Sequence, residues 1–576
     1  MIFNYQRDFE CGYHNPPFFF CNITRDIYRS HMPIVRFPDF ISVPNGTSSM
    51  ERHALKHPII ARISLCLILL IAGVASAQDY QAPTEIEIDA LVQRALEAFD
   101  IPGIAVGIIQ DGEIIHARGY GVRKLGAPER VDADTLFQIA SNTKAMTSAA
   151  LAILMDEGKL TWDDKVTDHI AEFRMHEPYA SREFTIRDLL THRSGLPLGA
   201  GDLLFWPEAQ STIDEVINAL QYLKPATSFR STYAYDNLLY QLAGEVVTRA
   251  SGVSFSDFIE QRIFAPLGMN NCKGNHSRVP TAANEATPHA MVDGELETQT
   301  FHQATGSLAA AGGVNCNINS LLKWLDLQLN HGEMASGENL FSKQRHAEMW
   351  TPVTITNVIP PAAPGDKVAM TFYALGWNIS ETMGHQTIAH TGGLGGMLTS
   401  TVMIPEKNLG ILVLTNQANG YARGAIISEL LSGYLKHDQA LDFEARVAAS
   451  RQGSDDALEE MARLWAERDV SIKPSLSLDA YTMTYADNWY GDVSIAMDGE
   501  ALRFISHRSA KLTGLLRHFE GDTFIVEWDD RAYVADAYLS FKLTEDGDIE
   551  RIEMAQFDPR TDFSFDFWDL DLRPKN

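Results

Sequence analysis

Segments that favour β-strands lie at both ends of a long helix-rich stretch, and this order is the strongest constraint on how the chain folds. Two β-rich runs, 104–109 and 113–117, flank Asp111-Gly112, a dipeptide that favours a tight hairpin turn. Short turns join neighbouring strands, so we expect one antiparallel sheet packed with a helical part, an α/β (α+β) sandwich. The expected strands are 104–109, 113–117, 374–379, 387–390, 398–404 and 410–416, and the expected helices are 141–156, 213–220, 238–250, 320–329 and 424–434.

The C-terminal part of the chain has a different sequence pattern from the part before it. A chain of 576 residues exceeds the usual size of one domain, so at least two are expected. We assign the first domain to residues 85–435 and a charged, Ala-rich helical connector to residues 436–475. From 476 to 576, short alternating runs separated by turn residues predict a small β-barrel. Its expected strands are 483–485, 492–497, 502–505, 523–527, 540–543 and 549–554.

The N-terminal region carries the pattern of an export signal. Basic residues follow Met50, an apolar run covers 63–75, and Ala75-Ser76-Ala77 has the small residues of a cleavage site. The run is shorter than the roughly 20 residues that a membrane-spanning helix needs, and an uncleaved anchor helix is the alternative. We therefore expect residues 50–77 to be a signal peptide, cleaved after Ala77 on the way to the periplasm or the outside of the cell. Residues 1–49 are then expected to be a mis-called or disordered extension.

Charge and cysteine content exclude several classes of ligand. The formal net charge of −28 repels phosphate backbones and anionic lipids, so we expect no nucleic-acid partner and no stable membrane partner after signal cleavage. Only Cys272 and Cys316 follow the predicted cleavage site, and they either pair or remain buried free thiols. No His/Cys cluster has zinc spacing. We therefore predict no metal site, and the sequence leaves the oligomeric state open.

The first candidate for catalysis is the tetrad Ser141-Asn142-Thr143-Lys144, at the start of the expected helix 141–156. A helix places Lys144 on the same face as Ser141, and a serine at this position can cap the free amides. An amine one turn from a hydroxyl can take its proton if burial lowers the lysine pKa. The helix start also favours a developing oxyanion. A lone S-x-x-K pattern often occurs by chance in a chain of this length, and the alternative is a capped helix with a surface lysine.

The second candidate is Tyr235-Asp236-Asn237, which precedes the expected helix 238–250. A tyrosine hydroxyl near two ammonium groups can ionise below its usual pKa of about 10 and serve as a general base. Asn237 can offer an amide donor and an acceptor to a peptide-like substrate. The alternative for this tripeptide is a loop tyrosine followed by a helix-capping asparagine.

The third candidate is His390-Thr391-Gly392-Gly393, which follows an expected strand. Glycines at a strand edge let a substrate backbone approach closely, and the amide of Gly393 can act as a second oxyanion donor. His390 can transfer a proton, or hold a carboxylate when it is charged. The alternative is a glycine-rich hairpin turn with a solvated histidine.

The order of these three motifs resembles the layout of serine β-lactamases and penicillin-binding proteins, nearest to the class C enzymes and the D-alanyl-D-alanine peptidases. The resemblance spans roughly residues 85–435 and includes the phrases 189–196, 265–269 and 311–313. The C-terminal part resembles the lipocalin-like barrel appended to some peptidases of the family, in its texture and in the phrase Asn488-Trp489-Tyr490-Gly491.

The resemblance implies a covalent mechanism without a metal or cofactor. Ser141 would attack an amide or ester carbonyl, with Lys144 and Tyr235 relaying its proton. The amides of Ser141 and Gly393 would form the oxyanion hole, and water activated by Tyr235 would release the acyl group. The residues expected to bind substrate are Asn237, His390, Thr391, Gly392 and Gly393.

Two departures from the family pattern bear on the substrate. His390 stands where class C β-lactamases usually have lysine, and a neutral histidine holds a substrate carboxylate less firmly. Asp236 stands where serine or alanine is more usual, and a carboxylate beside Tyr235 raises the tyrosine pKa unless it points away. We therefore expect a hydrolase of small esters or peptides, including peptides with D-residues. A β-lactamase and a slowly acylating penicillin-binding or peptidoglycan-binding protein are the alternatives.

Three further segments receive other interpretations. His192 and Arg193 are expected to close a loop after a helix. The acidic, aromatic segment 558–572 is expected to be a solvated or barrel-covering tail, with a calcium or partner site as the alternative. The loop 199–206 is expected to take part in substrate specificity, as loops around a cleft do.

Overall fold

The computed structural model describes residues 82–209, 211–299, 309–360, 369–436 and 442–575. Residues from Pro83 onward form one compact unit. The predicted extension 1–49 and the predicted signal peptide 50–77 lie outside the described residues. Within the described ranges, no helix is both long enough and apolar enough to cross a membrane.

The first part of this unit is built on an eight-stranded sheet in the order β2-β1-β12-β11-β10-β9-β8-β7. Neighbouring strands are antiparallel, as the short turns predict. The N-terminal hairpin joins the later strands through β1, whose Ile104 pairs with Thr415. Asp111 and Gly112 have φ angles of 54° and 78°, the left-handed region that the predicted hairpin turn requires. The strands are β1 (Gly103–Gln110), β2 (Glu113–Gly121), β7 (Thr354–Ile359), β8 (Ala369–Tyr373), β9 (Asn378–Thr382), β10 (His385–Leu394), β11 (Met397–Ile404) and β12 (Leu409–Thr415).

Most helices lie between β2 and β7 in the sequence, where the helix-rich middle was expected. The long helix after the sheet domain, α15, falls within the stretch predicted to be a helical connector. The helices are α2 (Glu85–Ala98), α3 (Thr143–Asp156), α4 (Val166–His169), α5 (Pro178–Glu183), α6 (Ile186–Leu189), α7 (Ile213–Ala219), α8 (Leu238–Ser251), α9 (Phe255–Ile259), α10 (Ala265–Leu267), α11 (Ala309–Gly312), α12 (Ile318–Leu329), α13 (Lys343–Met349), α14 (Gly420–Leu435) and α15 (Phe443–Glu467).

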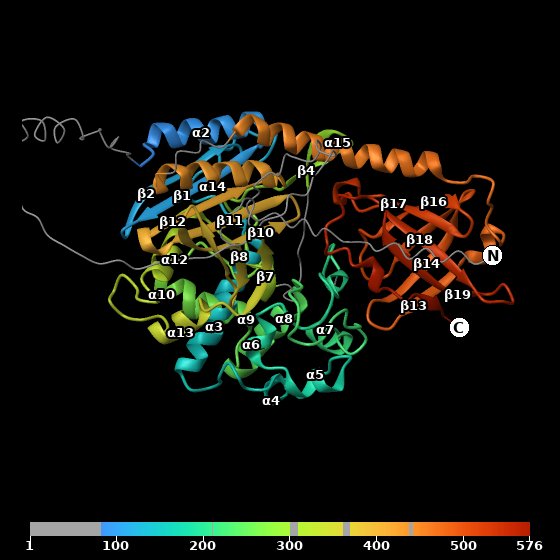
Figure 1. The fold of residues 1–576 in the computed structure, drawn as a ribbon, viewed down its shortest axis with the longest axis horizontal. Coiled ribbons are helices and arrows are strands. Elements are labelled where there is room, and N and C mark those ends of the chain that lie inside the picture. Colours follow the sequence, from blue (N-terminus) through green and yellow to red (C-terminus); the bar gives the residue numbers. More distant parts are fainter. Residues whose placement is uncertain (1–81, 210, 300–308, 361–368, 437–441, 576) are drawn as a thin grey trace, which may run out of the picture. The chain divides into compact units, whose positions relative to one another are not determined.

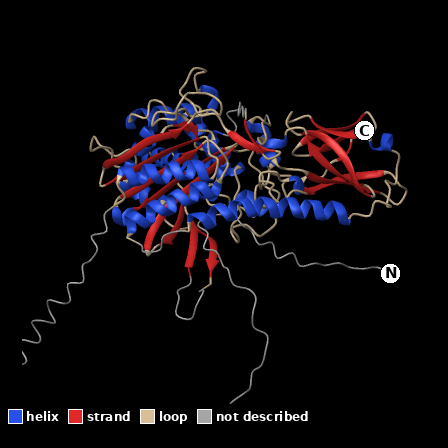
Figure 2. Cartoon of the chain, turned by 90° about the horizontal axis from the view of Figure 1, so that it is seen from above, coloured by secondary structure: helices blue, strands red, loops and turns tan. Residues whose placement is uncertain are grey.

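Alternating residues of β1 belong to two separate cores, because successive side chains of a strand point to opposite faces. Ile104 and Val106 pack in one core with residues of α2 and α14. Ala105 and Ile109 pack in the other core with residues of α3 and α12. Helices α2 and α14 cover one face of the sheet, and α12 and α3 lie on the opposite side (Figure 1). The view from above shows helices lying across the strands (Figure 2). The predicted sandwich of an antiparallel sheet and helices is confirmed.

A disulfide lies close to the start of α3. Cys272 and Cys316 are bonded, which decides the alternative that the sequence left open. Cys316 belongs to the short strand β6 (Asn315–Cys316), where it pairs with Phe137 of β3 (Phe137–Gln138). The bridge therefore fastens β6, and β6 pairs with β3, the strand that leads directly into the Ser141 turn.

The C-terminal part is a second eight-stranded sheet, in the order β19-β18-β17-β16-β15-β14-β13-β20. Ile552 of β19 forms a bridge with Leu572, just before β20, so the two edges of the sheet meet in a nearly closed barrel. The predicted small barrel is confirmed. β16 was not expected, because Arg517, His518 and Glu520 make its sequence unusually polar. The strands are β13 (Met483–Asp487), β14 (Gly491–Asp498), β15 (Ala501–Ser506), β16 (Thr513–Glu520), β17 (Thr523–Trp528), β18 (Ala537–Leu543), β19 (Ile549–Gln556) and β20 (Arg573–Pro574).

Candidate active site

Ser141 lies on a tight turn between β3 and α3. Residues Ala140–Asn142 form the 3-10 turn η1, and α3 begins only at Thr143. Ala140 has a φ of 47°, which is costly for a residue with a side chain and is found preferentially at functional sites. The expectation that Ser141 caps the helix is wrong, because the N-cap residue is Asn142 and its side chain makes no capping hydrogen bond.

Neighbouring strands hold this turn in place. Asn142 Nδ2 donates to Thr399 Oγ1 at 2.7 Å, and Thr399 Oγ1 donates to the Ile139 carbonyl oxygen at 2.9 Å. Gly392 of β10 allows a close approach, since a Cβ atom there would lie 2.3 Å from the Ile139 carbonyl oxygen and 3.1 Å from Ala140 Cβ. The glycine predicted to help bind substrate therefore also has a packing role against the Ser141 turn.

The side chain of Lys144 is fully buried and reaches three polar atoms. Its Nζ lies 3.1 Å from Ser141 Oγ, 2.6 Å from Asn237 Oδ1 and 3.0 Å from the carbonyl oxygen of Ala311. A neutral amine has two N–H donors and one lone pair. The oxygens of Asn237 and Ala311 can only accept, so they take the two donors. The lone pair is then directed to the hydroxyl of Ser141.

Burial makes the neutral form of Lys144 accessible at neutral pH. Loss of solvent lowers the pKa of Lys144 to about 7, although the nearby carboxylates of Asp202 and Asp236 act in the opposite direction. The pKa shift that the predicted mechanism requires is therefore present, and its main cause is desolvation.

Asp202 is a residue that sequence reasoning missed. It lies in the 3-10 turn η2 (Asp202–Leu204), within the loop predicted to influence specificity, and its side chain is fully buried. Asn237 Nδ2 donates to Asp202 Oδ2 at 2.8 Å, while the Oδ1 atom of Asn237 accepts from Lys144. Burial raises the pKa of Asp202 to about 8. Asn237 thus bridges Lys144 and Asp202. The only sequence signal for Asp202 was its place in the loop 199–206, which was predicted to influence specificity.

Tyr235 is half-buried and lies beside Lys144, whose Nζ is 4.7 Å from the centre of the tyrosine ring. Burial raises the pKa of Tyr235 well above 10, and a hydrogen-bonding contact with Ser141 acts in the opposite direction. The sequence predicted a lowered pKa from two neighbouring ammonium groups. Lys144 supplies one of the two cations, but the position at which class C enzymes have the second lysine is occupied by His390, whose ring is neutral. Tyr235 therefore keeps its hydroxyl hydrogen at neutral pH.

Asp236 points away from Tyr235, which resolves the departure noted in the sequence. Its carboxylate accepts from Ser194 Oγ at 3.1 Å and from the amide of Leu239 at 3.1 Å, at the start of α8. Its own amide donates to His192 Nδ1 at 3.2 Å. The ring of His192 lies against Tyr235, with 4.1 Å between the ring centres. His192 therefore packs against the ring of Tyr235 and accepts a hydrogen bond from the amide of Asp236, the next residue in the chain.

His390 is buried, and both of its ring nitrogens have partners. Nδ1 lies 2.6 Å from the carbonyl oxygen of Thr391, which can only accept, so Nδ1 carries the hydrogen. Nε2 then accepts from the hydroxyl of Tyr373 at 2.9 Å. Burial and the charge of Lys144 lower the pKa of His390 to about 3. The ring is therefore neutral and cannot act as a cationic anchor for a carboxylate.

The end of β10 is open on one side. Within the described chain, β9 pairs with β10 as far as Ala389, whereas β11 continues to Leu394. Thr391 and Gly393, both predicted to bind substrate, are exposed on this segment. An extended substrate can pair with such an edge through its backbone.

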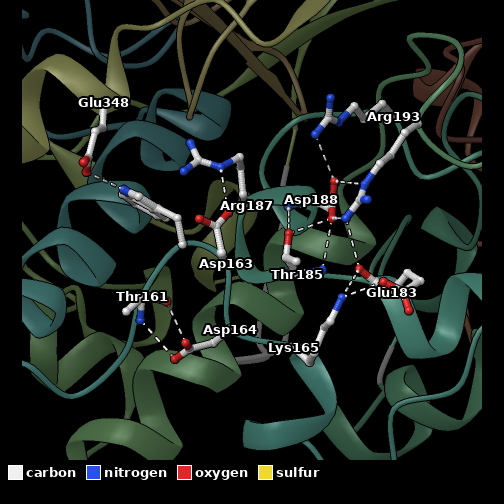
Figure 3. A network of polar contacts seen from close by, with 12 residues as sticks. Thr161, Asp163, Asp164, Lys165, Glu183, Thr185, Arg187, Asp188, Arg193 and Glu348 are labelled. Carbon is white, nitrogen blue, oxygen red and sulfur yellow. Dashed lines mark hydrogen bonds and ion pairs between the residues drawn. The ribbon is translucent and has the colours of Figure 1, made fainter.

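The loop that carries His192 is anchored by Asp188. This carboxylate is fully buried and accepts from Thr185 Oγ1 at 2.6 Å, from Arg193 Nη2 at 3.2 Å and from Arg230 Nε at 2.9 Å. Figure 3 shows Arg193 directed toward Asp188, with Thr185 beside it. Arg193 therefore fastens the loop, which is the role expected for it.

The comparisons with known proteins identify the family. The sequence profile described as Beta-lactamase matches residues 88–432, more than half of the chain. The chain belongs to the beta-lactamase family. A second profile, a domain of unknown function (DUF3471), matches residues 467–574, which include the barrel.

Two curated proteins have sequences similar to that of this beta-lactamase family member. The unguisins hydrolase ungD of Aspergillus violaceofuscus is 24% identical over 473 residues, which cover 77% of this chain and 82% of that protein. Protein flp of Staphylococcus aureus (strain MW2) is 24% identical over 346 residues, which cover 58% of this chain and 64% of that protein.

A solved structure has the same fold. The octameric penicillin-binding protein homologue from Pyrococcus abyssi aligns with a TM-score of 0.54 and 21% identity, over 85% of this chain and 100% of that chain. The family is therefore beta-lactamase, and the fold is one shared with a penicillin-binding protein homologue, as the three motifs predicted. The family and the hydrolase among its relatives support a serine hydrolase. In the described ranges, no group of three or more His, Cys, Asp or Glu side chains is arranged to hold a metal ion.

Proposed function

We propose that this protein is an exported serine hydrolase that forms an acyl-enzyme on Ser141 and acts on small esters or peptides, including peptides with D-residues. The observation that carries the proposal is the 3.1 Å contact between Lys144 Nζ and Ser141 Oγ, with the other two contacts of Nζ made to acceptor oxygens. A lysine with a pKa of about 7 is an effective general base at neutral pH.

In the acylation step, Ser141 Oγ attacks the carbonyl carbon while its proton passes to Lys144 Nζ. The carbonyl electrons move to the oxygen, where the amides of Ser141 and Gly393 donate hydrogen bonds. Collapse of this intermediate breaks the bond to the alcohol or amine. Tyr235 gives its hydroxyl proton to the leaving group and regains one from the Lys144 ammonium. The raised pKa of Tyr235 suits this donor role better than the role of a phenolate base.

Release of the acyl group follows the same path in reverse. Water attacks the ester on Ser141, and its proton reaches Lys144 through the hydroxyl of Tyr235. The intermediate then collapses, the bond between the acyl carbon and Ser141 Oγ breaks, and the Lys144 ammonium returns its proton to Ser141 Oγ as the acid leaves. Lys144 thus takes the base role in both steps, which modifies the initial assignment of water activation to Tyr235.

The neutral state of His390 favours esters and peptides over β-lactams that carry a carboxylate. Both nitrogens of the ring are already bonded to Thr391 and Tyr373. A relative that covers most of this chain is named as a hydrolase of unguisins, which supports turnover rather than a slowly acylating binding protein.

The decisive experiment compares turnover by the purified protein on three substrates: a nitrophenyl acetate, a D-alanyl peptide and a chromogenic cephalosporin. We expect hydrolysis of the ester or the peptide and loss of that activity in Ser141→Ala, with a fluorophosphonate adduct on Ser141 seen by mass spectrometry. Faster turnover of the cephalosporin would favour a β-lactamase, and labelling without turnover would favour a binding protein. Full activity in Ser141→Ala would overturn the mechanism.

Export is a part of the same proposal. The disulfide between Cys272 and Cys316 supports it, because disulfides persist in oxidising compartments. Expression of the chain from Met50 is expected to give an extracytoplasmic protein that begins at Gln78, as measured by N-terminal sequencing. A cytoplasmic product with an intact segment 50–77 would contradict this.

A further inference from the structure

A segment of the C-terminal domain reaches the catalytic domain beside η2. The chain leaves the barrel after β19 and returns to it as β20. Between these strands, Asp566 is fully buried and accepts hydrogen bonds from the amides of Gly201 at 2.6 Å and Leu203 at 3.2 Å. This carboxylate therefore fixes the segment 563–566 to the turn that carries Asp202.

Phe563 sits against the same loop and against Tyr235. A Cβ atom on Gly199 would lie 2.5 Å from the carbonyl oxygen of Phe563 and 2.9 Å from its Cδ2, and Gly199 has a φ of 73°. Only glycine suits both conditions. The ring of Phe563 meets the ring of Tyr235 edge to face, with 5.8 Å between the ring centres. Phe563 is half-buried, so the residue is partly accessible to solvent.

Ser564 completes a chain of hydrogen bonds that ends at the nucleophile. Its Oγ donates to Asp202 Oδ2 at 2.8 Å, and Asn237 Nδ2 donates to the same oxygen at 2.8 Å. The other side of the Asn237 amide accepts from Lys144, which contacts Ser141. The hydroxyl of Ser564 thus restrains the carboxyl group of Asp202, which orients the Asn237 amide.

We propose that the C-terminal domain supplies two residues of the active site, with Ser564 as a positioning residue for Asp202 and Asn237 and Phe563 as an apolar wall beside Tyr235. This inference rests on the proposed function, because both roles concern attack by Ser141. It gives the barrel a part in the reaction, and it replaces the expectation that the whole segment 558–572 is a solvated or barrel-covering tail. Phe565 and Phe567 of the same segment do pack on barrel residues, against Tyr533 and Trp528.

The proposal predicts a specific effect on acylation for Ser564. Without its hydroxyl, Asp202 loses one of the two donors that hold Oδ2, and the Asn237 amide is less firmly oriented toward Lys144. The loss of one such bond typically costs about tenfold in the equilibrium that it supports. Because Ser564 acts on Lys144 through Asp202 and Asn237, its loss is expected to lower the rate constant for acylation and to leave the binding of the substrate nearly unchanged.

The test for Ser564 uses the full chain with three substitutions. Ser564→Ala is expected to lower the rate of fluorophosphonate labelling of Ser141 and the kcat for nitrophenyl acetate by about tenfold, and Ser564→Thr, which keeps a hydroxyl, to recover most of both. Ser475→Ala is the matched control. Ser475 Oγ donates to Asp522 Oδ2 at 2.7 Å in the same domain, so this variant loses the same kind of bond away from the site. Its labelling rate is expected to equal that of the wild type.

The test for Phe563 compares two esters that differ in acyl length. In Phe563→Ala, kcat/KM for a nitrophenyl hexanoate is expected to fall about tenfold relative to the acetate, because the longer chain loses apolar contact. Phe563→Leu keeps an apolar wall, so its ratio of kcat/KM for the hexanoate to that for the acetate is expected to lie between the ratios of the wild type and Phe563→Ala. A ratio that stays the same, or that moves in favour of the hexanoate, would overturn the role of Phe563.

The outcomes separate this inference from the proposed function. If wild-type Ser141 is not labelled and no substrate is turned over, the proposed function fails, and this inference fails with it. If the wild type is labelled and Ser564→Ala is labelled at the same rate, only the inference for Ser564 is overturned. Equal losses in Ser564→Ala, Ser564→Thr and Ser475→Ala would point to general destabilisation and would also overturn it.

Discussion

Tyr373 donates its hydroxyl hydrogen to His390 Nε2 across 2.9 Å, while His390 donates its Nδ1 hydrogen to the carbonyl oxygen of Thr391. The two bonds fix one neutral tautomer of the ring. Burial, together with the charge of Lys144, lowers the pKa of His390 to about 3, so the ring stays neutral over the whole physiological range. The open end of β10 therefore receives no positive charge from this residue.

Replacement of His390 by lysine is expected to move the preference toward β-lactams. An ammonium at this position can pair with the carboxylate of a cephalosporin, which a neutral ring cannot do. We expect the ratio of kcat/KM for the cephalosporin to that for nitrophenyl acetate to rise at least about tenfold in His390→Lys. His390→Gln, which stays neutral, is the control. A similar change of ratio in both variants would show that charge is not the cause.

The activity is expected to fall on the acid side of neutral pH. Only the neutral amine of Lys144 can receive the proton of Ser141, and the pKa of Lys144 is about 7. Below this pH the amine becomes protonated, so kcat/KM for a nitrophenyl ester should fall by about tenfold per pH unit and level off above it. The measurement is a pH–rate profile from about pH 5 to 9. A midpoint near 10 would indicate a lysine with an ordinary pKa and contradict the assignment.

Asp236→Asn provides an independent check on the acid limb of the pH–rate profile, the fall of kcat/KM below about pH 7. The charge of Asp236 raises the pKa of Lys144, against the larger effect of burial. Removal of this charge is therefore expected to lower the pKa of Lys144 and to shift the acid limb to lower pH. Asp236 and Asp202 have raised pKa values of about 6 and about 8, so both titrate in the same window and broaden the wild-type limb. A shift to higher pH in this variant would contradict the electrostatic account.

Tyr235→Phe tests whether the tyrosine acts as a hydroxyl or as a phenolate. The pKa of Tyr235 lies well above 10, so we expect the hydroxyl to act as a proton donor and carrier. Loss of such a group typically costs about 10²- to 10⁴-fold in rate. The acid limb of the pH–rate profile should stay at its wild-type position, because it belongs to Lys144. Disappearance of the limb in Tyr235→Phe would instead assign the titrating base to the tyrosine.

Much of the fold could be predicted from local patterns. The turn at Asp111-Gly112 and the apolar runs that became β1, β11 and β12 carry signals within a few residues. The strand β16 was not predicted, because a barrel strand with only one buried face tolerates charged residues such as Arg517. The cap assigned to Ser141 was wrong because the positive φ of Ala140, imposed by packing against β10 and β11, starts the helix later.

Of the candidate site, the sequence predicted only the residues that belong to the three motifs. Ser141, Lys144, Tyr235 and Asn237 come together as their order suggested. Asp202 was missed because a single carboxylate in a loop has no spacing pattern, and its position depends on tertiary packing. The state of Tyr235 was misjudged for a similar reason, since burial is a property of the folded molecule. Ser564 illustrates the limit most clearly, because it reaches the site from another domain.

Gly392→Ala tests whether the sheet holds the Ser141 turn. A Cβ atom at Gly392 would lie 2.3 Å from the carbonyl oxygen of Ile139 and 2.4 Å from Thr399 Oγ1, so the turn or the strand must move. Overpacking of this kind typically costs about 1–3 kcal/mol in the free energy of unfolding. Displacement of the turn should also separate Ser141 from Lys144 and lower kcat/KM by about 10²-fold or more.

The matched control is Gly420→Ala, at the start of α14, where a Cβ atom would meet no other atom within 4 Å. Alanine restricts the unfolded chain more than glycine does, so this variant is expected to be as stable as the wild type or slightly more stable. Thermal inactivation at one heating rate, together with kcat/KM, compares the two variants. Because Gly392 packs against the backbone before Ser141, its substitution should reduce activity even at temperatures at which the variant remains folded. A Gly392→Ala enzyme with wild-type activity and stability would mean that the turn is held independently of β10.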